Sequence, residues 1–472
     1  MSVAEQGASA VVLAAGLGQR MRSSLPKALL AVGGRPMVER VLAAACGAGL
    51  GHAVVVTGSG AEQVEAAIRK AAGGLPGLRI DFARQAQQRG TGDATLQALP
   101  LVAAGTVVVL PCDAPLLGAG QIRDLLAAHL GAGAGITLLT ARMTDPTGYG
   151  RVLRLPDGGV AGIVEERDAT PQQRALTEVF TLVACFRRDL LASALAECGT
   201  DNAQGEMYLP DTVGIARRRG EHVQALVAPV AAEVMGANDR RALAAAEAAL
   251  RTATLQRLMD AGVSVIDPAT TFVDESATIG ADSTLLPMTV IEGACSIGPG
   301  CEIGPGAHIR ESRIDAACRI WHSVIEQSEV GPECRVGPYA HLRPGSRLGR
   351  GVEVGNFAEV KNAILGDGTK QHHHSYVGDA ELGVAVNVGA GAITVNFDGQ
   401  RKHRTKVGAG AFIGCNVNLV APLEVGRGAF LAAGSTVNRP VPDDALAIAR
   451  ARQEVKDGWA ARKRRASPEG GA

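Results

Sequence analysis

Large aromatic side chains are scarce in this sequence, since Phe, Trp and Tyr together make up 3% of its 472 residues. An excess of one charge is lacking too: 47 basic and 47 acidic residues give a formal net charge of zero, which argues against a surface for nucleic acid or anionic lipid. No uncharged run approaches the roughly 20 residues of a membrane-spanning helix. We therefore expect small-molecule partners, and neither nucleic acid nor a membrane.

The cysteines give no sign of a disulfide framework. Their number, nine, is odd, and no two of them are spaced as C-x-x-C. Reduced thiols are the simplest interpretation, and they predict a cytoplasmic protein. The first apolar stretch has no basic segment before it and ends at Gly16, so it is typical of a β-strand and not of a signal peptide.

The second half of the chain contains a ladder of single aliphatic residues spaced six apart. Many are followed by glycine, as in Ile297-Gly298 and Val336-Gly337. A period of six is neither the 3.6 of an amphipathic helix nor the 2 of an amphipathic strand, and it predicts a β-solenoid of hexapeptide repeats with about ten coils. The unbroken runs are Val273, Ile279, Leu285, Ile291, Ile297, Ile303, Ile309; Val330, Val336, Leu342, Leu348, Val354, Val360; and Val407, Ile413, Leu419, Val425, Leu431, Val437.

Two irregularities interrupt this ladder. Between Ile309 and Val330 the register slips by three residues, and between Thr394 and Val407 there are thirteen residues where the ladder expects twelve. The second interval contains a polar segment at 396–403. Insertions in solenoids become loops, and loops on rigid scaffolds often carry function.

The first half alternates between strand-like and helix-like segments, which predicts a mostly parallel, Rossmann-like α/β sheet. Candidate strands are 10–14, 52–57, 106–110 and 135–140, and candidate helices are 36–48, 61–72 and 120–130. A chain of this length is expected to form two or more domains. We predict an α/β domain at 1–238, a linker helix at 239–261 that Asn238 or Asp239 could cap, the solenoid at 262–447, and a basic, solvated tail at 448–472.

A glycine-rich loop, Leu-Ala-Ala-Gly-Leu-Gly-Gln-Arg-Met at 13–21, follows the first candidate strand. Small residues let backbone N–H groups approach phosphate oxygens, and Arg20 and Lys27 would neutralise a polyphosphate. The loop is not a Rossmann fingerprint, because Met21 stands where a third glycine is needed, and it is not a P-loop. Taken alone, it is also compatible with a tight strand-to-helix turn.

The string L-A-A-G-x-G-x-R-M…P-K resembles the entry motif of sugar-nucleotide pyrophosphorylases. With the hexapeptide ladder behind it, the chain from about residue 9 to 460 is similar to the bifunctional N-acetylglucosamine-1-phosphate uridyltransferase / glucosamine-1-phosphate N-acetyltransferase family. Further motifs follow in the family's order: Gln85 with Gly90-Thr91-Gly92, Asp113-Ala114-Pro115-Leu116, Asp145-Pro146-Thr147-Gly148-Tyr149-Gly150-Arg151, and Gly162-Ile163-Val164-Glu165.

The resemblance implies an enzyme that makes UDP-N-acetylglucosamine, a precursor of peptidoglycan and lipopolysaccharide. Acetyl-CoA would acetylate glucosamine 1-phosphate on the solenoid, a left-handed parallel β-helix that forms homotrimers in the family. The α/β domain would then transfer uridylyl from UTP and release pyrophosphate, with Mg²⁺ as cofactor. Mg²⁺ prefers a few hard oxygen ligands and leaves the other positions to water and phosphate.

For the first site, the resemblance implies a set of residues on the α/β domain. Arg20 and Lys27 would contact the triphosphate as catalytic cations, and Asp113 and Asn238 would bind the magnesium ion. The other UTP and sugar contacts would be Leu13, Ala14, Ala15, Gly16, Gln85, Gly90, Thr91, Gly150 and Glu165, with Lys27 and Asn238 among them. Asp113 could instead be a helix-capping or turn residue before Pro115, and Asn238 could cap a helix, a role compatible with metal binding.

Two departures from the family pattern concern the sugar end of this site. Pro111-Cys112 stand where the family has Tyr or a small residue followed by Gly. Phe180-Thr181-Leu182 stand where it has Asn-Thr-Gly, and that Asn contacts the sugar. A phenylalanine cannot supply amide hydrogen bonds, so a weakened or altered uridyltransferase is one hypothesis.

For the second site, the resemblance implies His373 as the general base that takes a proton as the sugar amine attacks the thioester. Arg343 and Lys361 would bind the phosphate of glucosamine 1-phosphate, while Tyr376, Asn387 and Asn396 would orient the sugar and the base. The acetyl-CoA contacts would be Ala390, Asn396, Phe397, Cys415, Ala433 and Arg450.

Other interpretations of these residues remain open. His372 and His374 could share a side of a strand as metal ligands, but no further ligand pattern surrounds them. Cys415 is better explained as a small turn residue than as a nucleophile. For the whole chain, the rivals are another sugar-1-phosphate nucleotidyltransferase with a regulatory solenoid, and a trimeric acetyltransferase or scaffold with a weakened first site.

Overall fold

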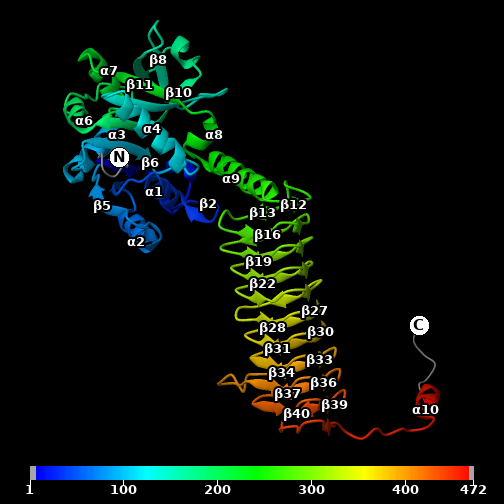
Figure 1. Cartoon of the computed structure of the whole chain (residues 1–472). Coiled ribbons are helices and arrows are strands. Elements are labelled where there is room, and N and C mark those ends of the chain that lie inside the picture. Colours follow the sequence, from blue (N-terminus) through cyan, green and yellow to red (C-terminus); the bar gives the residue numbers. More distant parts are fainter. Residues whose placement is uncertain (1–6, 467–472) are drawn as a thin grey trace. The chain divides into compact units, whose positions relative to one another are not determined.

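The computed structural model describes residues 7–466, which form two compact units that meet inside helix α9 (Arg240–Asp260), between Ala253 and Thr254. Figure 1 shows the α/β unit in blue to green and the coils of the second unit in green to orange. Among the helices of 7–466, none has the length and the apolar character needed to cross a membrane. All nine cysteines are free.

The first unit is built on one twisted sheet with strand order β11-β7-β10-β6-β1-β4-β5. Its strands run parallel except β10, which is antiparallel to both of its neighbours. The strands are β1 (Ala8–Ala14), β4 (His52–Thr57), β5 (Arg79–Arg84), β6 (Thr106–Pro111), β7 (Ile136–Arg142), β10 (Glu178–Arg187) and β11 (Val223–Val227).

Helices cover both faces of this sheet, as a parallel sheet requires. Alternate residues of β1 face opposite sides: Val12 lies in the hydrophobic cluster with α1 (Met37–Gly47), α2 (Ala61–Ala71) and α4 (Ala119–Gly131). Val11 lies in a second cluster with α3 (Thr91–Ala98), α6 (Arg188–Leu195) and α7 (Asp211–Arg218). The four candidate strands and three candidate helices of the sequence are confirmed, with ends that shift by at most two residues.

A short hairpin, β8 (Arg151–Arg154) and β9 (Val160–Val164), extends the sheet where Arg151 pairs with Val179 of β10. Strand β10 itself carries an irregularity between Phe180 and Ala184, and Leu182 there has a φ of 64°. The sequence analysis named none of these three strands, and it also missed the parallel strands β5 and β11.

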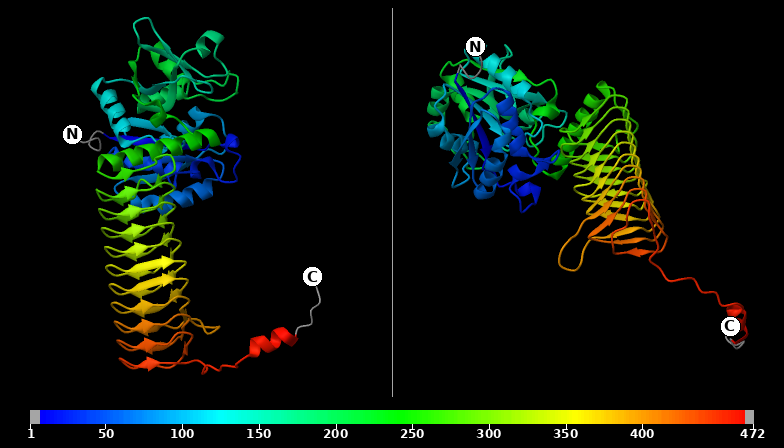
Figure 2. Two further views of the ribbon diagram at one scale, coloured as in Figure 1. Left: turned by 90° about the vertical axis from the view of Figure 1, so that its right-hand side faces the viewer. Right: turned by 60° about the horizontal axis from the view of Figure 1, so that its bottom comes forward.

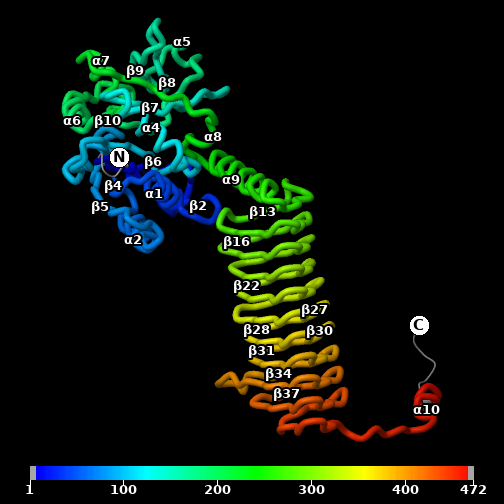
Figure 3. The backbone as a smooth tube through the Cα atoms, viewed as in Figure 1, coloured from blue at the N-terminus to red at the C-terminus, as the bar shows by residue number. Residues whose placement is uncertain are grey.

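The second unit is a parallel β-helix with three flat faces. Its short strands stack into sheets of 11, 10 and 9 members that begin with β12 (Ser264–Val265), β13 (Phe272–Val273) and β14 (Thr278–Ile279). Successive coils stack along the axis of the β-helix (Figure 3). The ladder residues point inward and form one continuous core, in agreement with the predicted solenoid of about ten coils.

The structure explains both irregularities of the ladder. The slip of three residues arises because three steps are shortened to five residues, from Ile309 to Ile314, from Ile320 to Ile325 and from Ile325 to Val330. The second irregularity is a loop between β34 (Ile393–Val395) and β35 (Thr405–Val407), visible in Figure 2 as a projection near the end of the helix. A bridge between Phe397 and Lys402 closes this inserted loop, residues 396–404.

Helix α9 begins where Asp239 caps it. The Asp239 carboxylate accepts hydrogen bonds from the backbone N–H groups of Arg241 (3.0 Å) and Ala242 (2.8 Å), which satisfies two of the donors that a helix leaves free at its start. At the other end of the helix, Leu255 and Leu258 are buried in the core of the β-helix. The tail runs on from the last coils to α10 (Trp459–Ala466), and residues 467–472 of the predicted tail lie outside the described residues.

Candidate active sites

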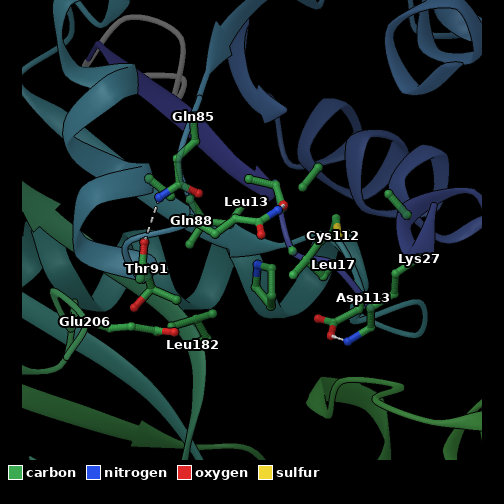
Figure 4. Close-up of a pocket in the computed structure, with 17 residues that line it drawn as sticks. Leu13, Leu17, Lys27, Gln85, Gln88, Thr91, Cys112, Asp113, Leu182 and Glu206 are labelled. Atoms are coloured by element: carbon green, nitrogen blue, oxygen red, sulfur yellow. Dashed lines mark hydrogen bonds and ion pairs between the residues drawn. The ribbon is translucent and has the colours of Figure 1, made fainter. Parts of the chain in front are cut away.

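A cavity of about 300 Å³ opens in the first unit at the carboxyl ends of β1, β5 and β6 (Figure 4). Ligands of open α/β sheets bind at this edge, because the loops that leave the strands meet there. Most of the predicted nucleotide contacts line it: Leu13, Ala14, Ala15, Gly16, Lys27, Gln85, Gly90, Thr91 and Asp113. The structure thus brings together residues from three separate motifs.

The glycine loop is fixed at both ends. Gln88 donates a hydrogen bond of 2.7 Å from Nε2 to the backbone oxygen of Ala15. Gly18 has a φ of 60°, and a Cβ placed on it would lie 2.6 Å from the Cβ of Lys27. Only glycine therefore allows the loop to close against Lys27.

Lys27 lies between the two predicted metal ligands. Its Nζ donates to Oδ2 of Asp113 and, at 2.7 Å, to Oδ1 of Asn238. Asp113 follows β6 and Asn238 precedes α9, and the backbone joins the two segments where the N–H of Ala237 donates to the Asp113 carbonyl at 2.7 Å. Two hard oxygens from separate loops therefore converge on one positive charge.

The segment of Gln85, Gly90 and Thr91, which is predicted to contact UTP, is packed against the loop that contains Met207. Gln85 is buried, and its Nε2 donates to the Gly90 carbonyl (3.0 Å) and to Oδ2 of Asp93 (2.7 Å). Gly90 has a φ of 103°, and a Cβ there would lie 2.4 Å from the carbonyl oxygen of Met207. These contacts hold the Gln85 and Thr91 side chains at the edge of the cavity.

Four predicted contacts lie outside the lining of this cavity: Arg20, Gly150, Glu165 and Asn238. Arg20 is exposed on the 3-10 helix Gln19–Met21, where its charge acts on Tyr149. Gly150 and Glu165 do lie together, since a Cβ on Gly150 would be 3.4 Å from Oε1 of Glu165. Burial, with the nearby carboxylates of Asp168, Asp211 and Glu206, raises the pKa of Glu165 to about 7.

The family departures take up defined positions. The Phe180 side chain is buried in the core of the sheet. Its backbone N–H donates a hydrogen bond of 2.9 Å to the carbonyl oxygen of Gly150, one of the predicted sugar contacts. Leu182 and Cys112 both line the cavity, and burial together with the charge of Asp113 raises the pKa of the Cys112 thiol to about 12. Leu182, Gln88 and Glu206 are lining residues that the sequence analysis did not assign; the last two carry no recognisable spacing.

On the β-helix, three cations form a second site. Leu342 pairs with Val360, which places Arg343 and Lys361 one above the other on one face. The charge of Arg343, followed by that of Lys402 in the inserted loop, lowers the pKa of Lys361. Glu359 accepts a bond of 2.7 Å from Arg343. Such a cluster of like charges is suited to bind an anion such as a phosphate.

One of the predicted sugar-orienting residues, Asn396, is bound to a carboxylate that the sequence analysis missed. Asp379 accepts hydrogen bonds of 2.5 Å from Asn362 and from Asn396. The Asn396 amide also reaches the hydroxyl of Tyr376, at 3.4 Å. Asp379 appeared in the sequence only as one residue of a solenoid turn, so no spacing singled it out.

His373 is exposed at the end of β30 (Lys370–His373), at the corner between two faces. Asn387 lies on the same face one coil later, paired with Lys370, and Tyr376 lies on the next face. His372 contacts Glu353 at 2.8 Å, and no group of three or more His, Cys, Asp or Glu residues within 7–466 is placed to hold a metal ion.

The predicted acyl-donor contacts follow one edge of the β-helix. The Ala390 carbonyl accepts from the N–H of Asn416 (2.7 Å), and the Cys415 carbonyl accepts from the N–H of Gly434 (2.8 Å), so Ala390, Cys415 and Ala433 recur on successive coils. The Cδ of Arg450 lies 3.6 Å from the position of a Cβ on Gly434. Phe397 is 56% exposed on the inserted loop.

Comparison with protein families finds two different matches along the chain. A family model for the MobA-like NTP transferase domain matches residues 10–265, and one for the bacterial transferase hexapeptide (six repeats) matches residues 276–311. The fold and the two sites therefore define a nucleotidyltransferase joined to a hexapeptide-repeat transferase, and the solenoid is the left-handed parallel β-helix that the ladder and the resemblance predicted.

Similar proteins match almost the whole chain. The bifunctional protein GlmU of Shouchella clausii is 45% identical over 455 residues, covering 96% of this chain and 98% of its own. Those of Geobacillus thermodenitrificans and Streptomyces avermitilis are each 46% identical, covering 96% and 97% of this chain and 98% and 95% of their own. The chain belongs to the bifunctional GlmU family. It is both a uridylyltransferase and an acetyltransferase in UDP-N-acetylglucosamine synthesis, and a purely regulatory solenoid is not favoured.

Proposed function

We propose that the two activities use the two clusters described above, with residues 1–238 responsible for uridylyl transfer and residues 262–447 for acetylation. The observation that carries this proposal is that each unit holds its own group of cations beside polar side chains, and each reaction has a phosphate-bearing substrate. Residues 239–261 form the linker helix, and the tail from 448 onward extends toward the acyl donor of a neighbouring copy.

In the acetylation site, Arg343 and Lys361 bind the phosphate of glucosamine 1-phosphate, and Lys402 adds a third charge. Tyr376, Asn387 and Asn396 orient the sugar. The nitrogen of the sugar amine forms a bond to the acetyl carbon, and the bond between that carbon and the CoA sulfur breaks. His373 accepts the proton that the amine loses. Ala390, Phe397, Cys415, Ala433 and Arg450 contact acetyl-CoA, with Asn396 at the same edge.

In the uridylyl site, the loop from Leu13 to Gly16 receives the phosphates of UTP on its backbone, and Gln85, Gly90 and Thr91 hold the uracil. Arg20 and Lys27 neutralise the triphosphate as an oxygen of the sugar phosphate attacks the α-phosphorus and pyrophosphate leaves. Gly150 and Glu165 contact the sugar. Each cation acts on charge that shifts from the α-phosphate to the leaving group.

Asp113 and Asn238 fit a magnesium ion by the chemistry of their donors. A carboxylate and an amide oxygen already converge on the Lys27 ammonium, and so few protein ligands leave positions for water and phosphate. The ion would supply charge neutralisation at the phosphates. Lys27 would then turn from Asp113 and Asn238 toward the triphosphate.

We further propose a cytoplasmic homotrimer joined through the β-helix. UTP and acetyl-CoA are cytoplasmic substrates, and the β-helix offers flat faces of stacked strands on which copies of the chain can pack. Sedimentation equilibrium at several concentrations measures the mass, and a monomer at every concentration would refute the trimer.

The assignment of two sites is tested with Lys27→Ala and His373→Ala. The first variant should lose pyrophosphate release with UTP and N-acetylglucosamine 1-phosphate and keep acetylation, and the second should show the opposite pattern. If either variant lost both activities while remaining folded, the separation of the sites would be refuted.

A further inference from the structure

One rung of the aliphatic ladder carries a carboxamide. Gln371 occupies the inward position of its coil, between Val354 of the coil before and Val388 of the coil after. Its side chain is 0% exposed, yet it ends in a carboxamide where the other inward residues of this column are hydrocarbon. Burying an amide among aliphatic side chains costs stability, and such local violations concentrate at functional sites.

The carboxamide of Gln371 joins two backbone segments. Nε2 donates to the carbonyl oxygens of Glu359 (3.2 Å) and Ser375 (3.4 Å). The Ser375 carbonyl also accepts from the Glu359 N–H at 2.9 Å. From inside the β-helix, Gln371 therefore links Ser375, which follows the corner of its own coil, to Glu359 on the preceding coil.

His373 lies on that corner. The next residue, His374, has a φ of 40°, a left-handed conformation that is unfavourable for a non-glycine residue. Apart from an edge contact with His372, the His373 imidazole has no partner among the described residues. The direction of the imidazole is thus decided by the backbone of the corner.

Unpaired polar atoms gather at the same place. Within residues 7–466, three buried side-chain atoms lack a hydrogen-bond partner: Oε1 of Gln371, Oγ of Ser375 and Oγ1 of Thr405. Two of the three belong to residues that stand two positions before and two positions after His373. Within the described residues, the buried polar atoms that lack hydrogen-bond partners are therefore concentrated next to the proposed base, His373.

We propose that Gln371 is a positioning residue for acetylation, which holds the corner so that the His373 imidazole faces the amine of the sugar. This inference rests on the proposed function, because it takes His373 as the base. Gln371 touches neither substrate. It acts through the backbone of residues 373–375.

The test replaces the carboxamide and keeps the volume. Gln371→Met should lower kcat of acetylation by about tenfold or more, since small displacements of a catalytic group are costly. KM for glucosamine 1-phosphate should stay within about twofold, because Arg343 and Lys361 are unchanged. The pH at half-maximal kcat should also change, and the thermal unfolding midpoint should stay equal or rise. Uridylyl transfer by the first unit serves as an internal measure of the amount of enzyme, and the unfolding midpoint reports on the β-helix.

Two further variants keep the result interpretable. Ile320→Met, in the same inward column several coils away, is the matched control and should leave kcat unchanged. Gln371→Leu replaces Gln371→Met if the latter fails to fold. An unchanged kcat and pH profile in the folded variant would overturn the positioning role. If His373→Ala retained acetylation, the assignment of His373 as the base would be wrong. That outcome is distinct from a failure of the positioning role of Gln371.

Discussion

The side-chain amide of Asn396 donates a hydrogen bond of 2.5 Å to the carboxylate of Asp379. The other oxygen of the same carboxylate accepts a bond of 2.5 Å from Asn362, one coil earlier. Asp379 thereby fixes the base of the inserted loop to the body of the β-helix. The loop carries Phe397 and Lys402, so the geometry of the acetylation site depends on a residue that bears none of the roles predicted from the sequence.

Replacing Asp379 should therefore impair acetylation. In Asp379→Ala, the amides of Asn362 and Asn396 lose their acceptor and the loop is no longer held, so we expect kcat/KM for acetylation to fall by about 10- to 100-fold. Uridylyl transfer should not change. The control is Glu381→Ala, which removes an exposed ion pair with Arg404 and should have little effect. Equal activities in the two variants would contradict this role.

Leu182 should limit the binding of the sugar phosphate. Its side chain lines the cavity, and its φ of 64° favours glycine by about 1 kcal/mol. Leu182→Gly and Leu182→Ala both widen the cavity, and only the first relieves the backbone. We expect KM for N-acetylglucosamine 1-phosphate to fall in both, and the free energy of unfolding to be higher in the glycine variant than in the alanine variant. Initial rates measure KM, and calorimetry measures the free energy of unfolding. An unchanged KM in both variants would show that Leu182 does not limit the binding of the sugar phosphate.

Glu165 should make uridylyl transfer depend on pH near neutrality. Its pKa is raised to about 7, chiefly by burial, so the carboxylate that accepts hydrogen bonds from a sugar is fully formed only above that pH. Activity should rise as pH increases through about 7, and Glu165→Gln should remove this rise. A profile with the same ascending limb in the variant would assign it to another group.

The same shift also affects stability. Because the folded protein binds this proton more tightly than the unfolded chain, the contribution of Glu165 to stability is present below pH 4.5 and is lost as pH rises through about 7. Glu165→Gln should therefore show a smaller decrease in unfolding midpoint between pH 5 and pH 8, as measured by thermal unfolding.

Removal of magnesium should separate the two activities. Chelation with EDTA is expected to abolish uridylyl transfer, because Asp113 and Asn238 would hold the ion there. Acetylation should continue, since the proposed roles of Arg343, Lys361 and His373 need no metal ion. Added Mg²⁺ should restore the first activity in the wild type and not in Asp113→Ala. Loss of acetylation on chelation would contradict the assignment of one metal site.

Sequence reasoning located four of the α/β strands and the solenoid because both depend on local patterns. The inward rung every six residues requires only that each hexapeptide bury one aliphatic side chain, and the structure confirms this for the three aliphatic runs between Val273 and Val437. Strand β10 was not identified, because its antiparallel pairing with β6 and β7 depends on neighbours far away in the chain. Asp379 was missed for the same reason, since its partners lie one coil before and one coil after.

The sequence by itself determined that two units of different pattern share this chain, and that the first opens with a strand followed by a glycine-rich loop. Both follow from the spacing of small and aliphatic residues, which acts over a few positions. Only the tertiary structure decided that Lys27 lies between Asp113 and Asn238, that Leu182 enters the cavity while Phe180 is buried, and that Gln371 stands behind His373. Such relations join residues on separate strands, loops and coils, and packing fixes them only when the whole unit has folded.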